Sequence, residues 1–329
     1  MNFISNIGYV GVAIAGGYLA INGNITVGDI QSFIQYNKQF TQPINQIAQV
    51  SSMLQAMVAA TERIFEFLEE DEEVETYVEG TTTEGLKGNV KFDHVKFGYN
   101  PENIVIKDFN ADVHEGQKIA IVGPTGAGKS TMVKLLMRFY DVTDGAILLD
   151  GHNIKDFKRG ELRQMFGMVL QDTWLFDGTV KENIIYNREN VSDEKIVKVC
   201  KEVGLDHFIK TLPHGYNSKL SDNDSVSAGQ RQLLTIARGM IEDSPFLILD
   251  EATSNVDTRT EELVQKAMDK LTEGKTSFII AHRLSTIKNA DLILVMKEGN
   301  IVEQGNHEEL MKKNGAYAEL YNSQFDSIE

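Results

Sequence analysis

The 329-residue sequence has little of several things that would point to particular classes of protein. Cys200 is its single cysteine, so no disulfide can form within the chain, which fits a reducing compartment. Lysine and arginine number 32 against 48 aspartate and glutamate residues, and the formal net charge is -16. Because nucleic-acid binding depends on clustered basic residues, no nucleic-acid partner is expected. Internal repeats and low-complexity tracts are also absent from the sequence.

Charge is missing from the amino terminus, from Met1 through Asn24. A secretory signal peptide needs a basic segment before its apolar run, and this sequence has none there. The apolar run at residues 7–21 is near the length of a membrane helix, which needs roughly 20 residues. Its glycine and alanine content suits close helix packing in lipid. We therefore expect a membrane helix, and the alternative is a buried helix of a soluble protein.

A second helix is predicted from about Val27 to Leu68, interrupted only by Pro43. Five glutamines recur along it alternately four and three residues apart, which places them on one helical face. They are Gln35, Gln39, Gln42, Gln46 and Gln49. In a soluble bundle this face would be exposed to solvent, whereas in a membrane it would line a bundle interior or a water-filled pathway. The apolar run that precedes the helix favours the pathway.

The pattern of apolar and polar residues changes after an acidic stretch. Residues 69–88 begin with consecutive acidic side chains and are interpreted as a solvated linker. From residue 89 onward, short apolar runs alternate with helical stretches, which is typical of an α/β domain with a largely parallel sheet. The predicted organisation is therefore a helical membrane segment at 1–68, a linker at 69–88 and an α/β domain at 89–329.

The strongest motif is GPTGAGKST at residues 123–131, which we call the phosphate loop. It follows a predicted strand at 118–122 and precedes a helical run, so GxxxxGK[ST] stands in the context that it requires. Glycines let backbone N–H groups converge on phosphate oxygens, and the helix N-terminus adds a favourable dipole. We expect Lys129 to reach the β- and γ-phosphates and Ser130 to coordinate Mg²⁺. The nucleotide-binding residues expected here are Gly123, Thr125, Gly126, Gly128, Lys129, Ser130 and Thr131.

A second predicted strand, residues 246–249, leads into two carboxylates, Asp250 and Glu251. Ligands bind at the carboxyl ends of strands in α/β sheets, so Asp250 is placed to hold the Mg²⁺. Glu251 is the candidate for polarising the attacking water, because phosphoryl transfer needs a positioned nucleophile more than covalent help. An apolar strand followed by aspartate is a weak signal by itself. The phosphate loop gives it weight.

Residues 226–232, VSAGQRQ, resemble the LSGGQ signature that separates ABC ATPases from other phosphate-loop NTPases. Other pieces resemble that family in the expected order: Gln171 the Q-loop glutamine, Asp257 the D-loop aspartate and His282 the switch histidine. Tyr99 resembles the aromatic residue that stacks on adenine, and its alternative is an ordinary packed aromatic. The resemblance covers essentially all of residues 89–329 and is closest to the exporter branch.

This resemblance implies an α/β phosphate-loop NTPase fold with a helical subdomain near residues 154–245, and ATP and Mg²⁺ as cofactors. It implies catalytic roles for Glu251, His282 and Gln171, with Gln171 also near the metal. The signature departs from LSGGQ but keeps its hydroxyl and backbone donors; the residues kept are Ser227, Gly229 and Gln230. In the family these residues complete the ATP site of a second subunit, so catalysis implies a homodimer or heterodimer.

Exporter half-subunits of this kind carry six membrane helices before the ATPase domain, whereas this sequence has room for about two. We therefore expect an N-terminally incomplete chain of a plasma-membrane exporter, with the ATPase domain in the cytoplasm and a small molecule, lipid or peptide as substrate. Two alternatives come from other classes. A soluble ABC protein is disfavoured by the uncharged amino terminus, and a nucleotide-binding regulator without turnover is disfavoured by Glu251 and His282.

Overall fold

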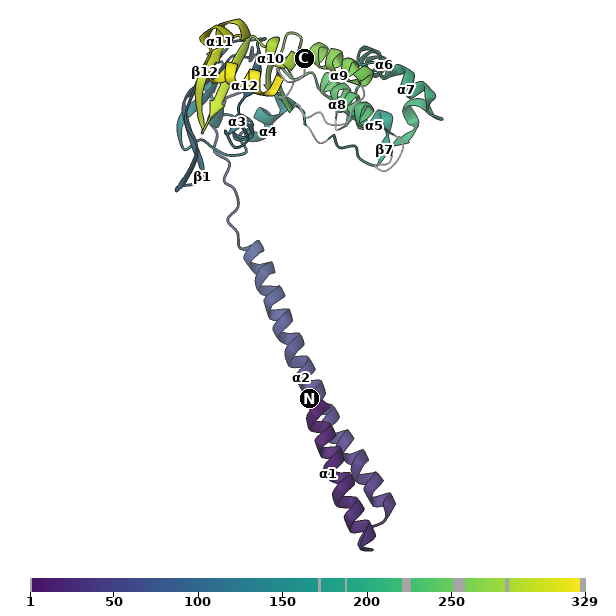
Figure 1. Cartoon of the computed structure of the whole chain (residues 1–329). Helices are drawn as coiled ribbons and strands as arrows, with labels where there is room; N and C mark the ends of the chain where they lie inside the picture. Colours follow the sequence, from purple (N-terminus) through teal and green to yellow (C-terminus); the bar gives the residue numbers. More distant parts are fainter. Residues whose placement is uncertain are drawn as a thin grey trace. The chain divides into compact units, whose positions relative to one another are not determined.

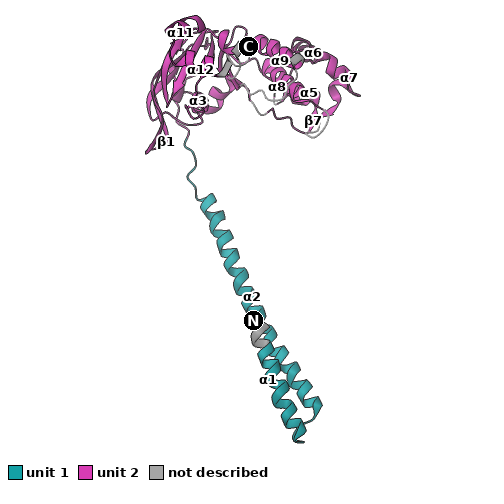
Figure 2. Cartoon of the chain, in the orientation of Figure 1, with its two compact units in different colours: residues 1–74 teal, residues 75–329 magenta. Residues whose placement is uncertain are grey.

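The structure is a computed structural model that describes residues 2–170, 173–186, 188–220, 226–250, 258–281 and 284–325. The chain divides into two compact units, residues 1–74 and residues 75–329 (Figure 2). The first unit contains two helices, α1 (Asn2–Ile21) and α2 (Val27–Leu68). The second unit contains the strands and the other helices of the chain (Figure 1).

Helices α1 and α2 pack closely where small or short side chains lie. A Cβ added to Gly16 would come within 2.9 Å of Ile30, so the absence of a side chain lets the helices approach each other. Helix α2 begins with a capping box, in which Thr26 and Asp29 each accept a hydrogen bond from the other's backbone N–H. The helix then runs without a break through Pro43. Both helices predicted from the sequence are present.

The outer faces of α2 are exposed, including all five glutamines of the predicted stripe. Large apolar side chains share this exposure, among them Phe40 at 72% and Ile47 at 70%. Helix α2 contains no buried residue. The sequence predicts a membrane helix over residues 7–21, and across the described part of the chain no helix is both long enough and apolar enough to cross a membrane.

The second unit is built on a ten-stranded sheet with the strand order β5-β4-β1-β2-β12-β11-β3-β10-β9-β6. The strands are β1 (Val90–Asn100), β2 (Asn103–Val113), β3 (Lys118–Val122), β4 (Asp144–Leu149), β5 (His152–Asn153), β6 (Phe166–Val169), β9 (Phe246–Asp250), β10 (Thr276–Ile280), β11 (Leu292–Lys297) and β12 (Asn300–Gly305). Strands β6, β9, β10, β3 and β11 pair in parallel, whereas β1, β2, β4 and β5 pair antiparallel.

The sheet is therefore mixed, whereas the sequence indicates a largely parallel one. The physical reason is the length of the connections. Strands β1 and β2 are joined by a tight turn, with Asn100 paired to Asn103, and a turn this short can join only antiparallel strands. The parallel strands are separated in the chain by helices or longer segments, as parallel pairing requires.

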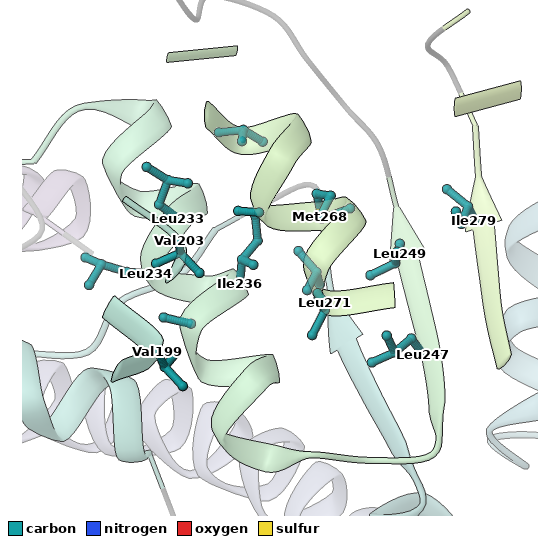
Figure 3. Close-up of a cluster of buried hydrophobic side chains, with 14 of the residues drawn as sticks. Val199, Val203, Leu233, Leu234, Ile236, Leu247, Leu249, Met268, Leu271 and Ile279 are labelled. Carbon is teal, nitrogen blue, oxygen red and sulfur yellow. The ribbon is translucent and has the colours of Figure 1, made fainter. Parts of the chain in front are cut away.

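Alternate residues of the parallel strands enter two different cores, because successive side chains of a strand point to opposite faces. Leu247 and Leu249 of β9 belong to one core, whereas Phe246 and Ile248 belong to the other. Helices cover the first core, mainly α5 (Val180–Ile185), α6 (Asp193–Glu202), α8 (Ala228–Glu242) and α9 (Thr258–Thr272). Figure 3 shows Leu247 and Leu249 pointing toward Leu271 of α9.

The remaining elements are mostly short. They are α3 (Lys129–Leu136), η1 (Ile154–Asp156), α4 (Arg159–Gln164), α7 (Asp206–Thr211), η2 (Gly215–Asn217), α10 (Leu284–Lys288), α11 (His307–Lys313) and α12 (Ala316–Phe325), with a small sheet of β7 (Gly178–Thr179) and β8 (Lys219–Leu220). The helical subdomain predicted near residues 154–245 is represented by α5 to α8. Strand β6 falls inside that range but pairs with β9 in the main sheet.

Candidate functional site

The phosphate loop joins β3 to α3, as the sequence predicts. Strand β3 ends at Val122, residues 123–128 form the turn, and α3 begins at Lys129. Strand β3 lies between β10 and β11, and both neighbours run parallel to it. The turn therefore leaves the carboxyl edge of the parallel strands, which is where open α/β sheets bind ligands.

Three glycines shape the turn, each with a positive φ: Gly123 at 149°, Gly126 at 81° and Gly128 at 103°. A Cβ on Gly128 would lie 2.7 Å from the Cδ1 atom of Ile106, and one on Gly123 would collide with the carbonyl of Met296. Packing against the β11 backbone therefore excludes a side chain at Gly123, whereas at Gly128 a Cβ would displace the tip of Ile106 and the positive φ favours glycine. A Cβ on Gly126 would meet nothing within 4 Å, so only its backbone conformation requires glycine and the space beside it is open to a ligand.

The start of α3 presents backbone donors to this space. Its N-cap is Gly128, which supplies no capping side chain. The first N–H groups of any helix have no acceptor within the helix, so those of Lys129, Ser130 and Thr131 are donors for an external group. Ser130 and Thr125 are exposed, and Thr131 is buried. Converging N–H groups at the positive end of a helix fit a phosphate.

Lys129 adds a positive charge over the same turn. Its Nζ atom donates to the carbonyl oxygens of Gly123, at 2.7 Å, and Pro124, at 3.0 Å. Partial burial lowers the pKa of Lys129, and the negative charge of Asp250 acts in the opposite direction. Asp250 ends β9, two strands away from β3. The structure thus brings the lysine and the first carboxylate of the second motif close enough to interact electrostatically.

Oxygen ligands for a divalent cation are available at this place. A Mg²⁺ ion that is bound mainly through nucleotide phosphates needs only one or two protein ligands. The exposed hydroxyl of Ser130 and the partly exposed carboxylate of Asp250 are of that kind. Nowhere in the described ranges do three or more histidine, cysteine or acidic side chains form a cluster that could hold a metal ion by itself.

Tyr99 lies near the end of β1 and is 42% exposed. Its hydroxyl group hydrogen-bonds with the Oγ1 atom of Thr131 at 3.2 Å, which ties the ring to α3. The ring also meets Phe97 and Tyr140 edge to face, with centroids 5.0 and 5.1 Å away. Sequence reasoning missed Tyr140, because its position just after α3 carries no pattern that distinguishes it from a packing residue.

The signature-like motif forms the start of α8. Ser227 is the N-cap: its Oγ atom accepts from the backbone N–H of Gln230 at 3.2 Å, and the Oε1 atom of Gln230 accepts from the N–H of Ser227 at 3.0 Å. The pattern Ser-x-x-Gln is a capping box, which explains why the chain begins a helix here. Ser227 is exposed and Gly229 is buried. Within the ranges described above, no hydrogen bond or ion pair joins this helix start to the phosphate loop.

Four predicted site residues lie outside the described residues: Gln171, Glu251, Asp257 and His282. The structure therefore does not place the candidate catalytic side chains. It does place the strands that precede three of them, because β6 ends at Val169, β9 at Asp250 and β10 at Ile280. These strands are adjacent and parallel, so their carboxyl ends meet at one edge of the sheet, together with that of β3.

Comparisons with known proteins agree on one family. The ABC transporter family model matches residues 106–254. A fatty acid ABC transporter ATP-binding/permease protein of Mycobacterium bovis is 50% identical over 319 residues, which are 97% of this chain and 50% of that protein. An uncharacterised ABC transporter ATP-binding protein of Bacillus subtilis is 45% identical over 327 residues, which are 99% of this chain and 54% of that protein.

A solved structure of a bacterial Atm1-family ABC exporter with ATP bound superposes with a TM-score of 0.73 at 34% identity, covering 98% of this chain and 57% of that one. The chain thus spans about half the length of the curated relatives that it matches. The matched family region contains the phosphate loop, the signature-like motif and Asp250. The resemblance drawn from the sequence motifs is confirmed: the chain carries the ATP-binding domain of the ABC transporter family.

Proposed function

We propose that this chain is an ATP-hydrolysing subunit of an exporter, which couples ATP binding and hydrolysis at a dimer interface to the export of an amphiphilic substrate. The observation that carries the proposal is the glycine turn between β3 and α3 at the carboxyl edge of the sheet, where Lys129 lies over the turn and Asp250 ends β9. Relatives named as an ATP-binding/permease protein and as an exporter support the membrane part of the proposal.

In this proposal the phosphate loop binds the triphosphate of ATP. The N–H groups at the start of α3 and the ammonium group of Lys129 contact phosphate oxygens. Ser130, Asp250 and Gln171 would hold Mg²⁺, and the bound ion would neutralise charge that develops on the phosphates. Gly126 leaves room for the phosphates, since no atom lies within 4 Å of where its Cβ would be.

The base is proposed to stack on Tyr99. The hydrogen bond between Tyr99 and Thr131 ties the ring to α3, so a base stacked on the ring would lie beside the helix whose start is proposed to bind the phosphates. An exposed aromatic face of this kind gains stacking energy with any purine. The edge-to-face contact with Tyr140 holds the ring in that orientation.

The hydrolytic step is assigned to residues that follow the strands at the same sheet edge. Glu251 orients the attacking water and accepts its proton, and His282 and Gln171 contact the γ-phosphate region. Asp257 is assigned to the boundary between two subunits. Their positions in the sequence, directly after β9, β10 and β6 or shortly beyond, support these roles.

Two subunits are proposed to share each ATP site. Ser227, Gly229 and Gln230 of one subunit would face the γ-phosphate bound to the other subunit. In the capping box the Ser227 Oγ atom accepts a hydrogen bond, so its hydroxyl hydrogen is still available as a donor. The donors offered to a facing phosphate are therefore chiefly this hydroxyl group and the backbone N–H groups at the start of α8. The partner is a second ABC half-subunit, identical or related.

Residues 1–68 are proposed to belong to a membrane domain, residues 69–88 to link it to the ATP-binding domain, and residues 89–329 to form that domain. The membrane would be the plasma membrane, with the ATP-binding domain in the cytoplasm. The exposed glutamines of α2 would face a substrate pathway. The substrate would be a lipid, a peptide or another amphiphilic small molecule, and a relative named for fatty acid transport supports this class.

Substitutions in the pocket test the proposal. Tyr99→Ala should weaken ATP binding by ~1–3 kcal/mol, the value of a base–aromatic stack. Lys129→Ala should weaken it more, because it removes a charged donor to the phosphates. The matched control is Tyr99→Phe, which keeps the ring but loses the hydroxyl group, and should stay near the parent affinity. Equal ATP affinity for the parent, Tyr99→Ala and Lys129→Ala, measured by equilibrium binding to the full chain, would contradict the proposal.

A further inference from the structure

The segment at residues 75–78, which we call the connector, carries the chain into the second unit. All four residues are exposed, so little apolar burial holds them in place. Hydrogen bonds hold them instead. The Oε1 atom of Glu75 accepts from the backbone N–H of Arg159 at 2.6 Å, and the backbone N–H of Val78 donates to the carbonyl of Asp156 at 2.9 Å.

Helix α4 gains from this attachment. It begins at Arg159, and its N-cap residue Lys158 provides no capping side chain. The carboxylate of Glu75 takes that place, accepting a hydrogen bond from the first N–H of the helix. The Nζ atom of Lys158 lies 5.2 Å from the ring centroid of Tyr77, which adds a cation–π contact.

Arg138 also holds the connector, through Thr76. Its side chain is fully buried. One terminal nitrogen donates to both the carbonyl oxygen and the Oγ1 atom of Thr76, at 2.9 and 3.1 Å. The other donates to the carbonyl of Phe157 at 2.7 Å, and Nε donates to Asp141 at 2.9 Å. The guanidinium group thus joins the connector to two separate segments of the ATP-binding domain.

Asp141 links the two arginines that hold the connector. It accepts from Nε of Arg138 and, at 3.0 Å, from a terminal nitrogen of Arg159. Burial by itself would raise the pKa of Asp141, but the hydrogen bond from Arg138 and the positive charges of Arg138, Arg159 and Lys155 lower it. The carboxylate therefore stays ionised at neutral pH and keeps both guanidinium groups in place.

The backbone conformation of Arg138 is one that favours glycine. Helix α3 ends at Leu136, its C-cap is Met137, and Arg138 follows with φ at 51°. That position in the left-handed region after a helix is most often glycine, because a Cβ there is unfavourable. Arg138 adopts this conformation although glycine would fit it better, and the side-chain hydrogen bonds of Arg138 offset the backbone strain.

We propose that Arg138 is a positioning residue that couples the connector to the phosphate-loop helix. The proposal rests on the proposed function in assuming that ATP binds at the start of α3. That helix has eight residues, so Arg138 lies roughly 12–14 Å from the phosphate-binding end along one short rigid element. When bound nucleotide orders the helix, the hydrogen bonds from Arg138 to Thr76 become more stable. By linkage, a connector that is hydrogen-bonded to Arg138 increases nucleotide affinity by the same factor.

Hydrogen exchange on the full chain tests this coupling at the backbone amide of Val78. Saturating Mg²⁺-ATP should slow exchange there by about fivefold or more, the lower range of allosteric coupling. The control amide is that of Gly88, which donates to Asp150 at 3.1 Å and has no contact with Arg138. Its exchange should change less. In Lys129→Ala, which should bind ATP more weakly, the exchange of Val78 should respond only at a correspondingly higher concentration of ATP.

Two variants separate coupling from simple loss of structure. Glu75→Gln with Thr76→Val weakens the connector side of the contacts and leaves the core intact. It should speed exchange at Val78 and reduce ATP affinity by at most the factor by which ATP slows exchange in the parent, because the hydrogen bond from Arg138 to the Thr76 carbonyl oxygen remains. Arg138→Lys keeps a positive charge beside Asp141 but loses the two terminal nitrogens that donate to Thr76 and Phe157. It should therefore lower the response of Val78 exchange to ATP while preserving the folded domain.

The outcomes are distinguishable. A parent chain that binds no ATP would refute the proposed function itself. ATP binding without any change at Val78, or an equal slowing at Val78 and Gly88, would overturn the coupling by Arg138 and leave the nucleotide site intact.

Discussion

The two units of the chain fold by different means. In the second unit, large apolar side chains are buried on both faces of the sheet, such as Phe246 at 0% exposure. In the first unit, α2 buries no residue, and Phe40 is 72% exposed. The helices of the first unit are therefore fixed by local signals, capping and close contacts between α1 and α2, whereas the second unit is stabilised by its own core. Exposed apolar surface on this scale is typical of a binding surface for lipid or protein.

The largest contrast is expected from truncating one phenylalanine in each unit. Phe246→Ala removes a ring stacked on Phe166 at 5.0 Å and leaves a cavity, so it should cost ~3–5 kcal/mol of unfolding free energy. Phe40→Ala, the matched control, should change the same quantity by less than about 0.5 kcal/mol. Urea unfolding of the full chain in detergent, followed by far-ultraviolet circular dichroism, which reports the helices of both units, measures both. Equal costs would show that Phe40 is packed against a partner in the folded chain.

Removing a helix cap should lower local stability less than truncating Phe246, and by about the same amount in both units. Ser227→Ala and Thr26→Ala each remove one capping box, and each should cost ~1 kcal/mol locally. Hydrogen exchange at Gln230 and Asp29, whose N–H groups donate to the two caps, reads the local opening. Equal losses would show that helix caps contribute alike in both units, so that the units differ in apolar burial alone. A loss confined to Ser227→Ala would contradict it.

Sequence patterns were informative wherever the signal was local. The strand–loop–helix around Lys129, the extent of α2 and the strand before Asp250 follow from spacing and periodicity over a few residues. The antiparallel half of the sheet was not foreseen, although Val95 and Phe97 alternate with polar residues as a half-buried strand would. Alternation predicts a strand but does not say which strand will pair with it or in which direction.

Arg138 shows a second limit. Its partner Thr76 is 62 residues away, and nothing near Arg138 in the sequence signals that its charge is buried. The contact exists only because the connector crosses the end of α3 in the folded domain. Tyr140 is similar, since its contact with Tyr99 depends on β1 lying beside the end of α3. Residues whose roles come from such distant contacts require a structure.

Phosphate release at saturating Mg²⁺-ATP is the decisive measurement for the claim that the ATP-binding domain hydrolyses ATP with Glu251 acting on the water. Glu251→Gln keeps the shape of the side chain but removes its charge, so ATP affinity should stay near that of the parent while the rate falls by ~10²–10⁴-fold. The same variant should then hold ATP between two subunits, visible as an ATP-dependent dimer by size-exclusion chromatography in detergent, and Ser227→Arg in that background should abolish the dimer. Phosphate release by Glu251→Gln at the parent rate would contradict the claim.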